Sequence, residues 1–96
     1  MPIIEVLQEW YKNISQNSMC MGIHIETVDN SGWCVCIDLF ETAYENRSFQ
    51  TVCMRKSRSN WFKCTKKNGL FKGSGGVQNL EDILKVFYCW IKARKA

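Results

Sequence analysis

The chain has one histidine, His24, and six cysteines, so the first chemistry to consider is a cysteine nucleophile activated by histidine. His24 lies in a segment of alternating polarity that predicts a strand, and Cys34 and Cys36 lie in the next such segment. If these strands pair, the three side chains project from the same face. The favoured interpretation of His24 is nevertheless a solvent-facing strand residue, because the pattern defines no third member of a triad. A thiol enzyme is the weakest alternative that we retain.

Two carboxylates, Glu26 and Asp38, are expected on that same face, on adjacent strands. Paired acids at a defined separation perform acid–base catalysis in glycoside hydrolases. That chemistry also needs a cleft that shields a carboxyl group from water, and a small open sheet does not provide one. We therefore expect this chain to have no catalytic residues and not to be an enzyme.

A glycine-rich stretch at residues 72–76 precedes the last helical segment. It lacks the G-x-x-x-x-G-K-[ST] pattern of a phosphate-binding loop, which also belongs to parallel α/β folds. The stretch therefore predicts a flexible loop rather than a nucleotide site.

The six cysteines could be free thiols, disulfides or metal ligands. Three disulfides would require an oxidising compartment, and six thiols allow 15 pairings. Zinc is disfavoured because Cys34 and Cys36 form a C-x-C pair without a second pair or a histidine at ligand spacing. We favour free, mostly buried thiols, since unpaired cysteine behaves as a small hydrophobe. No metal and no cofactor are expected.

The composition excludes several classes of protein. Ninety-six residues are enough for one domain, 1–96, and 46% hydrophobic with 12% aromatic residues excludes a disordered chain. No apolar run approaches the roughly 18–20 residues of a membrane span, so no membrane partner is expected. The N-terminal segment does not have the basic and apolar regions of a secretory signal. These features predict a cytoplasmic protein.

Charge is divided unevenly along the chain. Residues 1–46 contain seven acids and one base, a net charge of −6, whereas residues 47–96 contain twelve bases and two acids, a net charge of +10. This asymmetry indicates two electrostatic faces, unless folding interleaves the two halves so that their fields cancel. Basic residues among aromatic ones also allow a nucleic-acid site in the second half, although the pI of about 8.8 is lower than such domains favour.

Hydrophobic periodicity predicts a helix at each end of the chain with strands between them. Apolar residues at helical spacing indicate a helix over residues 2–15, and Asn79 with Asp82 forms a capping-box pattern before the last helix. Alternation predicts strands at 21–28 and 33–39, joined by a tight turn at 29–32. Further strands are expected at 48–55, 61–66 and 70–71. The predicted fold is α+β, an antiparallel meander of about four to five strands with both helices on one sheet face.

Residues 22–33, which read Gly-Ile-His-Ile-Glu-Thr-Val-Asp-Asn-Ser-Gly-Trp, resemble the immunity protein 53 family, as do residues 7–11. The Phe-Lys-Gly stretch that leads into Asn79-Leu80 agrees with the same family. The chain departs from the family pattern at Ser31, where proline is usual, and at residues 17–20, where a Trp-Glu-His-like segment is usual. The resemblance covers nearly the whole chain.

The resemblance implies a small bacterial antidote, encoded beside a polymorphic toxin, that binds and neutralises this toxin stoichiometrically. The expected partner is thus a cognate protein toxin, and a nuclease is the candidate that the charge asymmetry suggests. The open sheet face and its adjacent turns then supply the expected toxin-binding residues, which are Glu26, Asp29, Asn30, Asp38, Trp61 and Lys63. The main alternative is a small nucleic-acid-binding module that uses the basic C-terminal half.

Overall fold

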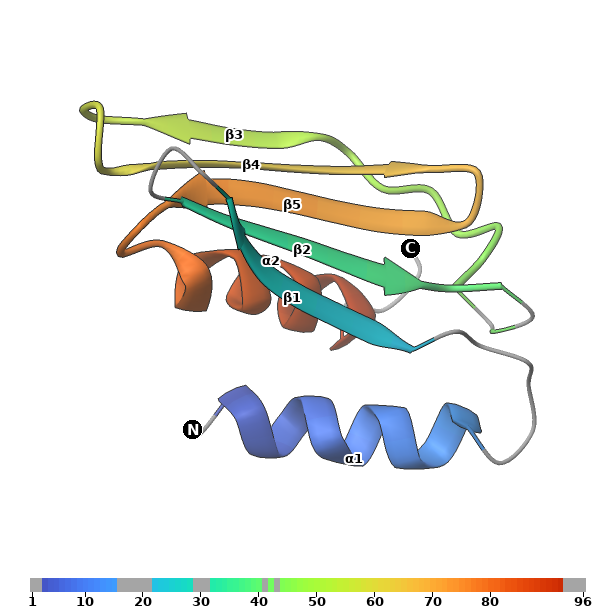
Figure 1. The fold of residues 1–96 in the computed structure, drawn as a ribbon. Coiled ribbons are helices and arrows are strands. Elements are labelled where there is room, and N and C mark those ends of the chain that lie inside the picture. Colours follow the sequence, from blue (N-terminus) through green and yellow to red (C-terminus); the bar gives the residue numbers. More distant parts are fainter. Residues whose placement is uncertain (1–2, 16–21, 29–31, 41, 43, 93–96) are drawn as a thin grey trace.

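A computed structural model describes residues 3–15, 22–28, 32–40, 42 and 44–92 of the chain. Their elements follow in the order α1 (Ile3–Ser15), β1 (Ile23–Val28), β2 (Gly32–Asp38), β3 (Val52–Arg55), β4 (Trp61–Lys67), β5 (Leu70–Gly76) and α2 (Leu80–Lys92). The predicted α+β fold, with a helix at each end and antiparallel strands between, is confirmed (Figure 1). Among the described helices, neither is long and apolar enough to cross a membrane.

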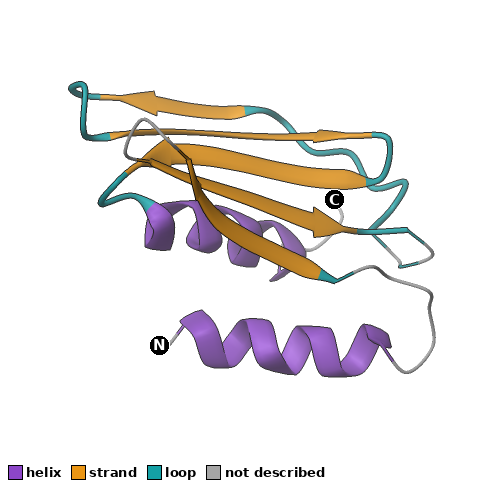
Figure 2. Ribbon diagram, in the orientation of Figure 1, coloured by secondary structure: helices purple, strands orange, loops and turns teal. Residues whose placement is uncertain are grey.

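The molecule has two layers. Both helices lie on the same side of the sheet, as predicted, and α2 packs against β4 and β5 (Figures 1 and 2). Within the described part of the chain, no helix lies on the opposite side of the sheet. We call this uncovered side the open face.

The strand order is β1-β2-β5-β4-β3, and every neighbouring pair is antiparallel. The predicted β1–β2 hairpin is confirmed, with Ile25 opposite Val35. The order departs from a simple meander at one step, because after β2 the chain crosses to the far edge and forms β3. It then returns through β4 and inserts β5 beside β2. The β4–β5 turn contains Asn68 and Gly69 at φ 54° and 74°, the positive values that tight hairpin turns require.

The prediction of a flexible glycine-rich loop at residues 72–76 is wrong, because these residues form most of β5 at the centre of the sheet. Their glycines allow α2 to approach closely. A Cβ atom added at Gly73 would overlap Cγ2 of Ile83, and one at Gly75 would lie 3.1 Å from Cδ1 of the same α2 residue. Glycine in this strand therefore reflects packing rather than flexibility.

The core lies between the sheet and the helices. The inward alternation predicted for the second strand is confirmed, since Val35, Ile37 and Leu39 are fully buried. Aromatic rings fill the space beneath the sheet, with Phe87 at 5.0 Å from both Trp10 and Phe71 between ring centroids. Such edge-on and tilted pairs stabilise a core beyond the area they bury.

The apolar stripe of α1 is only partly used for packing. Ile3, Leu7 and Trp10 are buried, whereas Ile4 and Tyr11 are 54% and 44% exposed. The helical spacing of these apolar residues predicted that they form a single stripe. The structure shows that this stripe is wider than the surface on which α1 packs, so Ile4 and Tyr11 remain at the surface beside β1.

Candidate functional site

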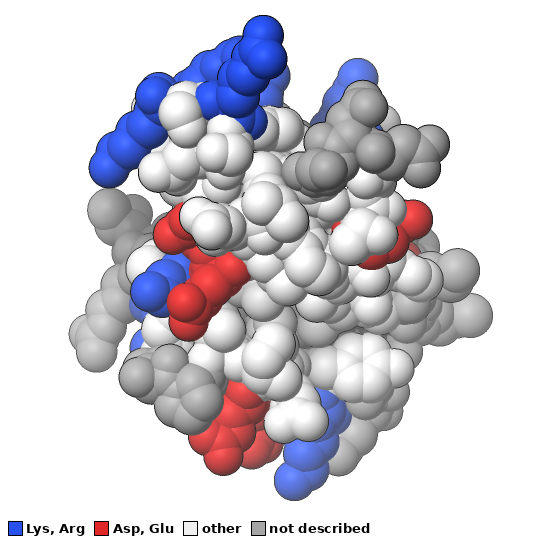
Figure 3. Space-filling model, turned by 60° about the vertical axis from the view of Figure 1, so that its left-hand side comes forward, with Lys and Arg blue, Asp and Glu red and all other residues white. Residues whose placement is uncertain are grey.

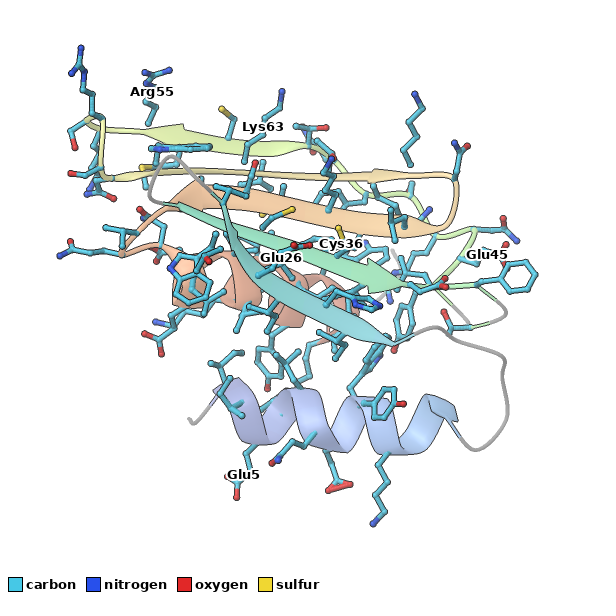
Figure 4. The ribbon with its side chains drawn as sticks, viewed as in Figure 1. Glu5, Glu26, Cys36, Glu45, Arg55 and Lys63 are labelled. Carbon is cyan, nitrogen blue, oxygen red and sulfur yellow. The ribbon has the colours of Figure 1, made fainter. Side chains whose placement is uncertain are left out.

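The open face is built from side chains that the strand register brings into rows. Val35, Ile37 and Cys64 are buried on the helix side, so their neighbours along each strand point to the open face. In one row that crosses the sheet, each residue is the cross-strand partner of the next. This row consists of Glu26, Cys34, Ser74 and Lys63. The next row is formed in the same way by His24, Cys36, Lys72 and Thr65. Figure 4 labels Glu26, Cys36 and Lys63 on β1, β2 and β4.

The structure places four of the six expected toxin-binding residues on the open face. Glu26 and Lys63 belong to one row, three strand spacings or about 14 Å apart. Trp61 lies two residues before Lys63 on β4, so its side chain points to the same face. Asp38 lies at the opposite end of the sheet, where it pairs with Leu70. Asp29 and Asn30 lie outside the described residues. The four residues thus do not form one compact cluster, but they face the same way.

The charge asymmetry of the sequence becomes an asymmetry across the sheet. Strands β1 and β2 come from the acidic half and occupy one side, whereas β5, β4 and β3 come from the basic half and occupy the other. The two halves are therefore not interleaved in the sheet. Lys and Arg side chains gather at the top of Figure 3, over the end of the sheet where β3 meets β4. Exposed Arg55, Lys56 and Arg58 lie in this region of the chain.

The centre of the open face contains Cys34 and Cys36 from β2 and two residues from β5 that the sequence did not reveal. These two, Ser74 and Lys72, lie between β2 and β4 in the two rows. Both belong to the segment that was expected to be a loop. Their alternation with Phe71, Gly73 and Gly75 was the available signal, but glycine at inward positions concealed it because it contributes no hydrophobic pattern.

The buried side chain of Asn79 fixes Trp61 relative to α2. Asn79 Oδ1 accepts a hydrogen bond from the main-chain N–H of Trp61 at 3.2 Å, and Asn79 Nδ2 donates to Asn60 Oδ1 at 3.0 Å and to Asp82 Oδ2 at 2.8 Å. The predicted helix start at Asn79 is confirmed, since its carbonyl oxygen accepts from the N–H of Ile83 at 3.1 Å. Two of the side-chain bonds join the helix start to the beginning of β4, and the third links the Asn79 and Asp82 side chains directly, so they are not the side-chain-to-backbone bonds of a capping box.

The prediction of mostly buried thiols is wrong for the described cysteines. Only Cys64 among them is buried; Cys34 and Cys36 are half-buried, and Cys53 and Cys89 are exposed. Cys53 is exposed because it lies on the edge strand β3 and its side chain faces away from the core. Cys20 lies outside the described residues. All five described cysteines are free, and the described residues contain no group of three or more His, Cys, Asp or Glu that could hold a metal ion.

The Cys36 thiol on the open face is not activated. Burial raises the pKa of the Cys36 thiol, neighbouring Cys34 raises it further, and the nearby Lys72 ammonium opposes this only in part. At neutral pH Cys36 is therefore a thiol rather than the thiolate that a nucleophile requires. The pairing of His24 with Cys36 does not by itself support a thiol enzyme.

Alkylation is expected to be fastest at Cys53 and Cys89, slower at Cys34 and Cys36, and undetectable at Cys64 until the chain unfolds. Burial raises the pKa of Cys64 to about 12, so only about one in ten thousand Cys64 side chains is ionised at about pH 8. Because an exposed thiol ionises at lower pH, Cys64 also lowers stability as the pH rises from 9 towards 12. Timed alkylation followed by peptide mass spectrometry measures the order. Faster labelling of Cys36 than of Cys53 would indicate an activated thiolate and contradict this account.

Comparison with known protein families identifies the family of this chain. The family model described as Immunity protein 53 matches residues 4–92, which is nearly the whole chain. The chain belongs to the immunity protein 53 family. No curated protein and no solved structure matches this chain. The match includes α1, the whole sheet and α2, so the family identity applies to the complete described fold. An immunity role follows from this membership.

Proposed function

We propose that this immunity protein binds a cognate bacterial toxin and neutralises it as a stoichiometric complex, with the open face as the main contact surface. The supporting observation is the uncovered sheet face, on which an acidic side and a basic side lie next to each other. Charged groups arranged in this way select a partner and speed its encounter, while the small central side chains allow close approach. The mechanism requires no catalytic group, metal or cofactor.

We further propose that the toxin is a nuclease, encountered in the bacterial cytoplasm. The acidic side of the open face, which contains Glu26 on β1 and Asp38 on β2, would face the basic surface that a nuclease uses to hold phosphate groups. Occupying that surface excludes nucleic acid. Complementary charge also predicts association that becomes slower as salt screens the two surfaces.

Charge reversal on the open face tests the surface. Glu26→Lys and Lys63→Glu are each expected to weaken toxin binding about ten-fold, which corresponds to about 1.4 kcal/mol. The measurement uses purified chain and the toxin domain encoded beside its gene, with the affinity determined at two salt concentrations. Growth of cells that co-express the toxin and each variant gives the matching functional result.

Lys85→Glu is the matched control, because Lys85 is exposed on α2 on the helix side of the sheet. It is expected to retain wild-type affinity. Equal changes in Lys63→Glu and Lys85→Glu, with a change of opposite sign in Glu26→Lys, would show that net charge rather than this face determines binding. No loss in either open-face variant would exclude the face.

The second candidate function is nucleic-acid binding by the basic end of the sheet. The observation that favours it is the cluster of Arg55, Lys56 and Arg58 near the β3–β4 turn, with Trp61 directly after it (Figure 3). Aromatic side chains stack on bases, and basic ones neutralise phosphate. A steep fall in affinity with salt for an oligonucleotide, and equal affinity across sequences, would distinguish this function from toxin binding.

A further inference from the structure

Strand β1 is the more accessible edge of the sheet. Among the described residues β2 is its only sheet neighbour, and five of its six residues are exposed. The other edge, β3, is only four residues long, contains Arg55, and leads directly into Lys56. Short length and charged side chains, lysine especially, are among the features by which proteins prevent an edge from pairing with another strand, and Glu26 is the only Asp, Glu, Lys or Arg on β1. By that measure β3 is protected and β1 is available.

An apolar groove lies beside this edge. It has a volume of about 330 Å³ and is formed between α1 and β1 by Ile4, Leu7, Gln8, Tyr11, Gly22, Ile23 and Ile25. Ile4, Tyr11 and Ile25 are each more than one-third exposed. Apolar side chains of an added strand, which point to one face at every second residue, would enter the groove while its backbone pairs with β1.

The open face alone is smaller than a typical stable interface. Its five strands are four to seven residues long and about 4.8 Å apart, so they cover roughly 500 Å², whereas a standard interface covers about 800 Å² per partner. Glu26 is on the open face and on β1 itself, so the edge and its groove extend this surface without a break. The β1 edge and its groove are therefore the adjoining surface that would bring the contact area up to that of a standard interface.

Charge indicates which occupant fits. The described residues of α1 and β1 contain the acids Glu5, Glu9 and Glu26 against the single base Lys12. Glu5 points away from the sheet in Figure 4, but a helix is only about 10 Å across, so both acids on α1 lie within about one screening length of the groove. A second copy of this chain would bring the same negative charge to the edge, so self-pairing is disfavoured. A basic segment is favoured.

We propose that β1 accepts an extended, basic segment of the toxin as a sixth strand, with alternate apolar residues in the α1–β1 groove and basic residues beside Glu26. This inference rests on the proposed function and names the structural element through which the partner binds. The main-chain hydrogen bonds provide affinity, whereas the groove and Glu26 provide specificity.

The first arm of the test uses a ten-residue peptide that alternates lysine with valine, added to the isotopically labelled full chain. Slower amide hydrogen exchange across Ile23–Val28 and shifted resonances of Ile4 and Tyr11 are expected at peptide concentrations up to about 1 mM. A peptide alternating glutamate with valine is expected to bind at least ten-fold more weakly. Protection at β3 instead of β1, equal binding of both peptides, or no response to the lysine peptide would overturn the proposal.

The second arm uses variants and the toxin domain. Ile25→Lys, which adds a charge at the groove side of β1, is expected to weaken toxin binding at least ten-fold, and Ile25→Val is expected to retain it. Thr51→Lys, an exposed position just before β3, is the control for added charge. Circular dichroism verifies that each variant is folded.

The outcomes separate the two proposals. If Ile25→Lys binds the toxin as wild type does while Glu26→Lys and Lys63→Glu weaken binding, strand addition is wrong and toxin neutralisation by the open face remains. If the wild-type chain does not bind the toxin, the proposed function itself fails, whatever the peptide experiment shows.

Discussion

Gly73→Ala is expected to lower the free energy of unfolding by about 3 kcal/mol. The added methyl group would overlap Cγ2 of Ile83, which is fully buried between α2 and the central strand. The helix would have to move away from the sheet or Ile83 would have to leave its rotamer. Strand propensity alone predicts the opposite sign, because alanine in a strand is favoured over glycine by about 0.5–1 kcal/mol. Urea unfolding measured by tryptophan fluorescence determines which effect is larger.

A double-mutant cycle identifies the cause. Ile83→Ala removes the overlapping methyl group and is expected to cost about 2–5 kcal/mol by itself, but the double variant should be clearly more stable than the sum of the two losses implies. Ser74→Ala, on the open face of the same strand, should change stability by less than about 0.5 kcal/mol. A neutral or stabilising Gly73→Ala substitution would show that α2 does not pack this closely on β5.

Asn79→Ala is also expected to cost about 3 kcal/mol, since it removes three hydrogen bonds and leaves the Trp61 N–H and the Asp82 carboxylate without their partner. Asn79 is only 1% exposed, so water cannot readily replace the lost amide. Urea unfolding measures the cost, and amide hydrogen exchange at Trp61 measures the local effect. Both the stability and the protection of Trp61 should fall.

The exposed neighbour Gln78 provides the matched control, and Gln78→Ala should leave both readouts unchanged. A loss below about 0.5 kcal/mol in Asn79→Ala, or unchanged exchange at Trp61, would show that Asn79 does not hold β4 against the helix.

The elements that sequence alone predicted well are those with a local signal. The β1–β2 hairpin combines alternating polarity with a turn, and α2 combines an apolar stripe with a start at Asn79. The Asn68-Gly69 turn likewise has residues that accept positive φ. These features depend on neighbours in sequence, so the chain reveals them without its fold.

The elements that sequence did not predict depend on contacts between distant segments. Gly73 and Gly75 are typical of a loop by composition, and only the position of Ile83 above them explains why they form a strand. The insertion of β5 beside β2 is equally non-local. Four of the expected site residues lie on the open face, as local alternation predicted, whereas the position of Ser74 and Lys72 between them depends on the non-local insertion of β5. The exposure of Ile4 and Tyr11 also follows from how much of α1 the rest of the fold covers.

The fold and the charge distribution together give the immunity protein a surface with two kinds of chemistry. Strands β1 and β2, which come from the acidic half of the chain, lie at one end of the strand order, and the apolar groove between β1 and α1 adjoins them. Strands β5, β4 and β3, which come from the basic half, lie at the other end, where β3 forms the protected edge. A partner that covers the open face would therefore meet opposite charges at its two sides, and this fixes its orientation as well as its affinity.

The most direct test of the central claim is calorimetric titration of the purified, nuclease-treated chain into the toxin domain encoded beside its gene. The account predicts one chain bound per toxin domain, with a Kd below about 1 µM that weakens as salt is raised, and loss of toxin activity at the same molar ratio. Absence of binding to the toxin domain, together with tight and steeply salt-dependent binding to an oligonucleotide, would contradict the account and assign the basic end of the sheet as the working surface.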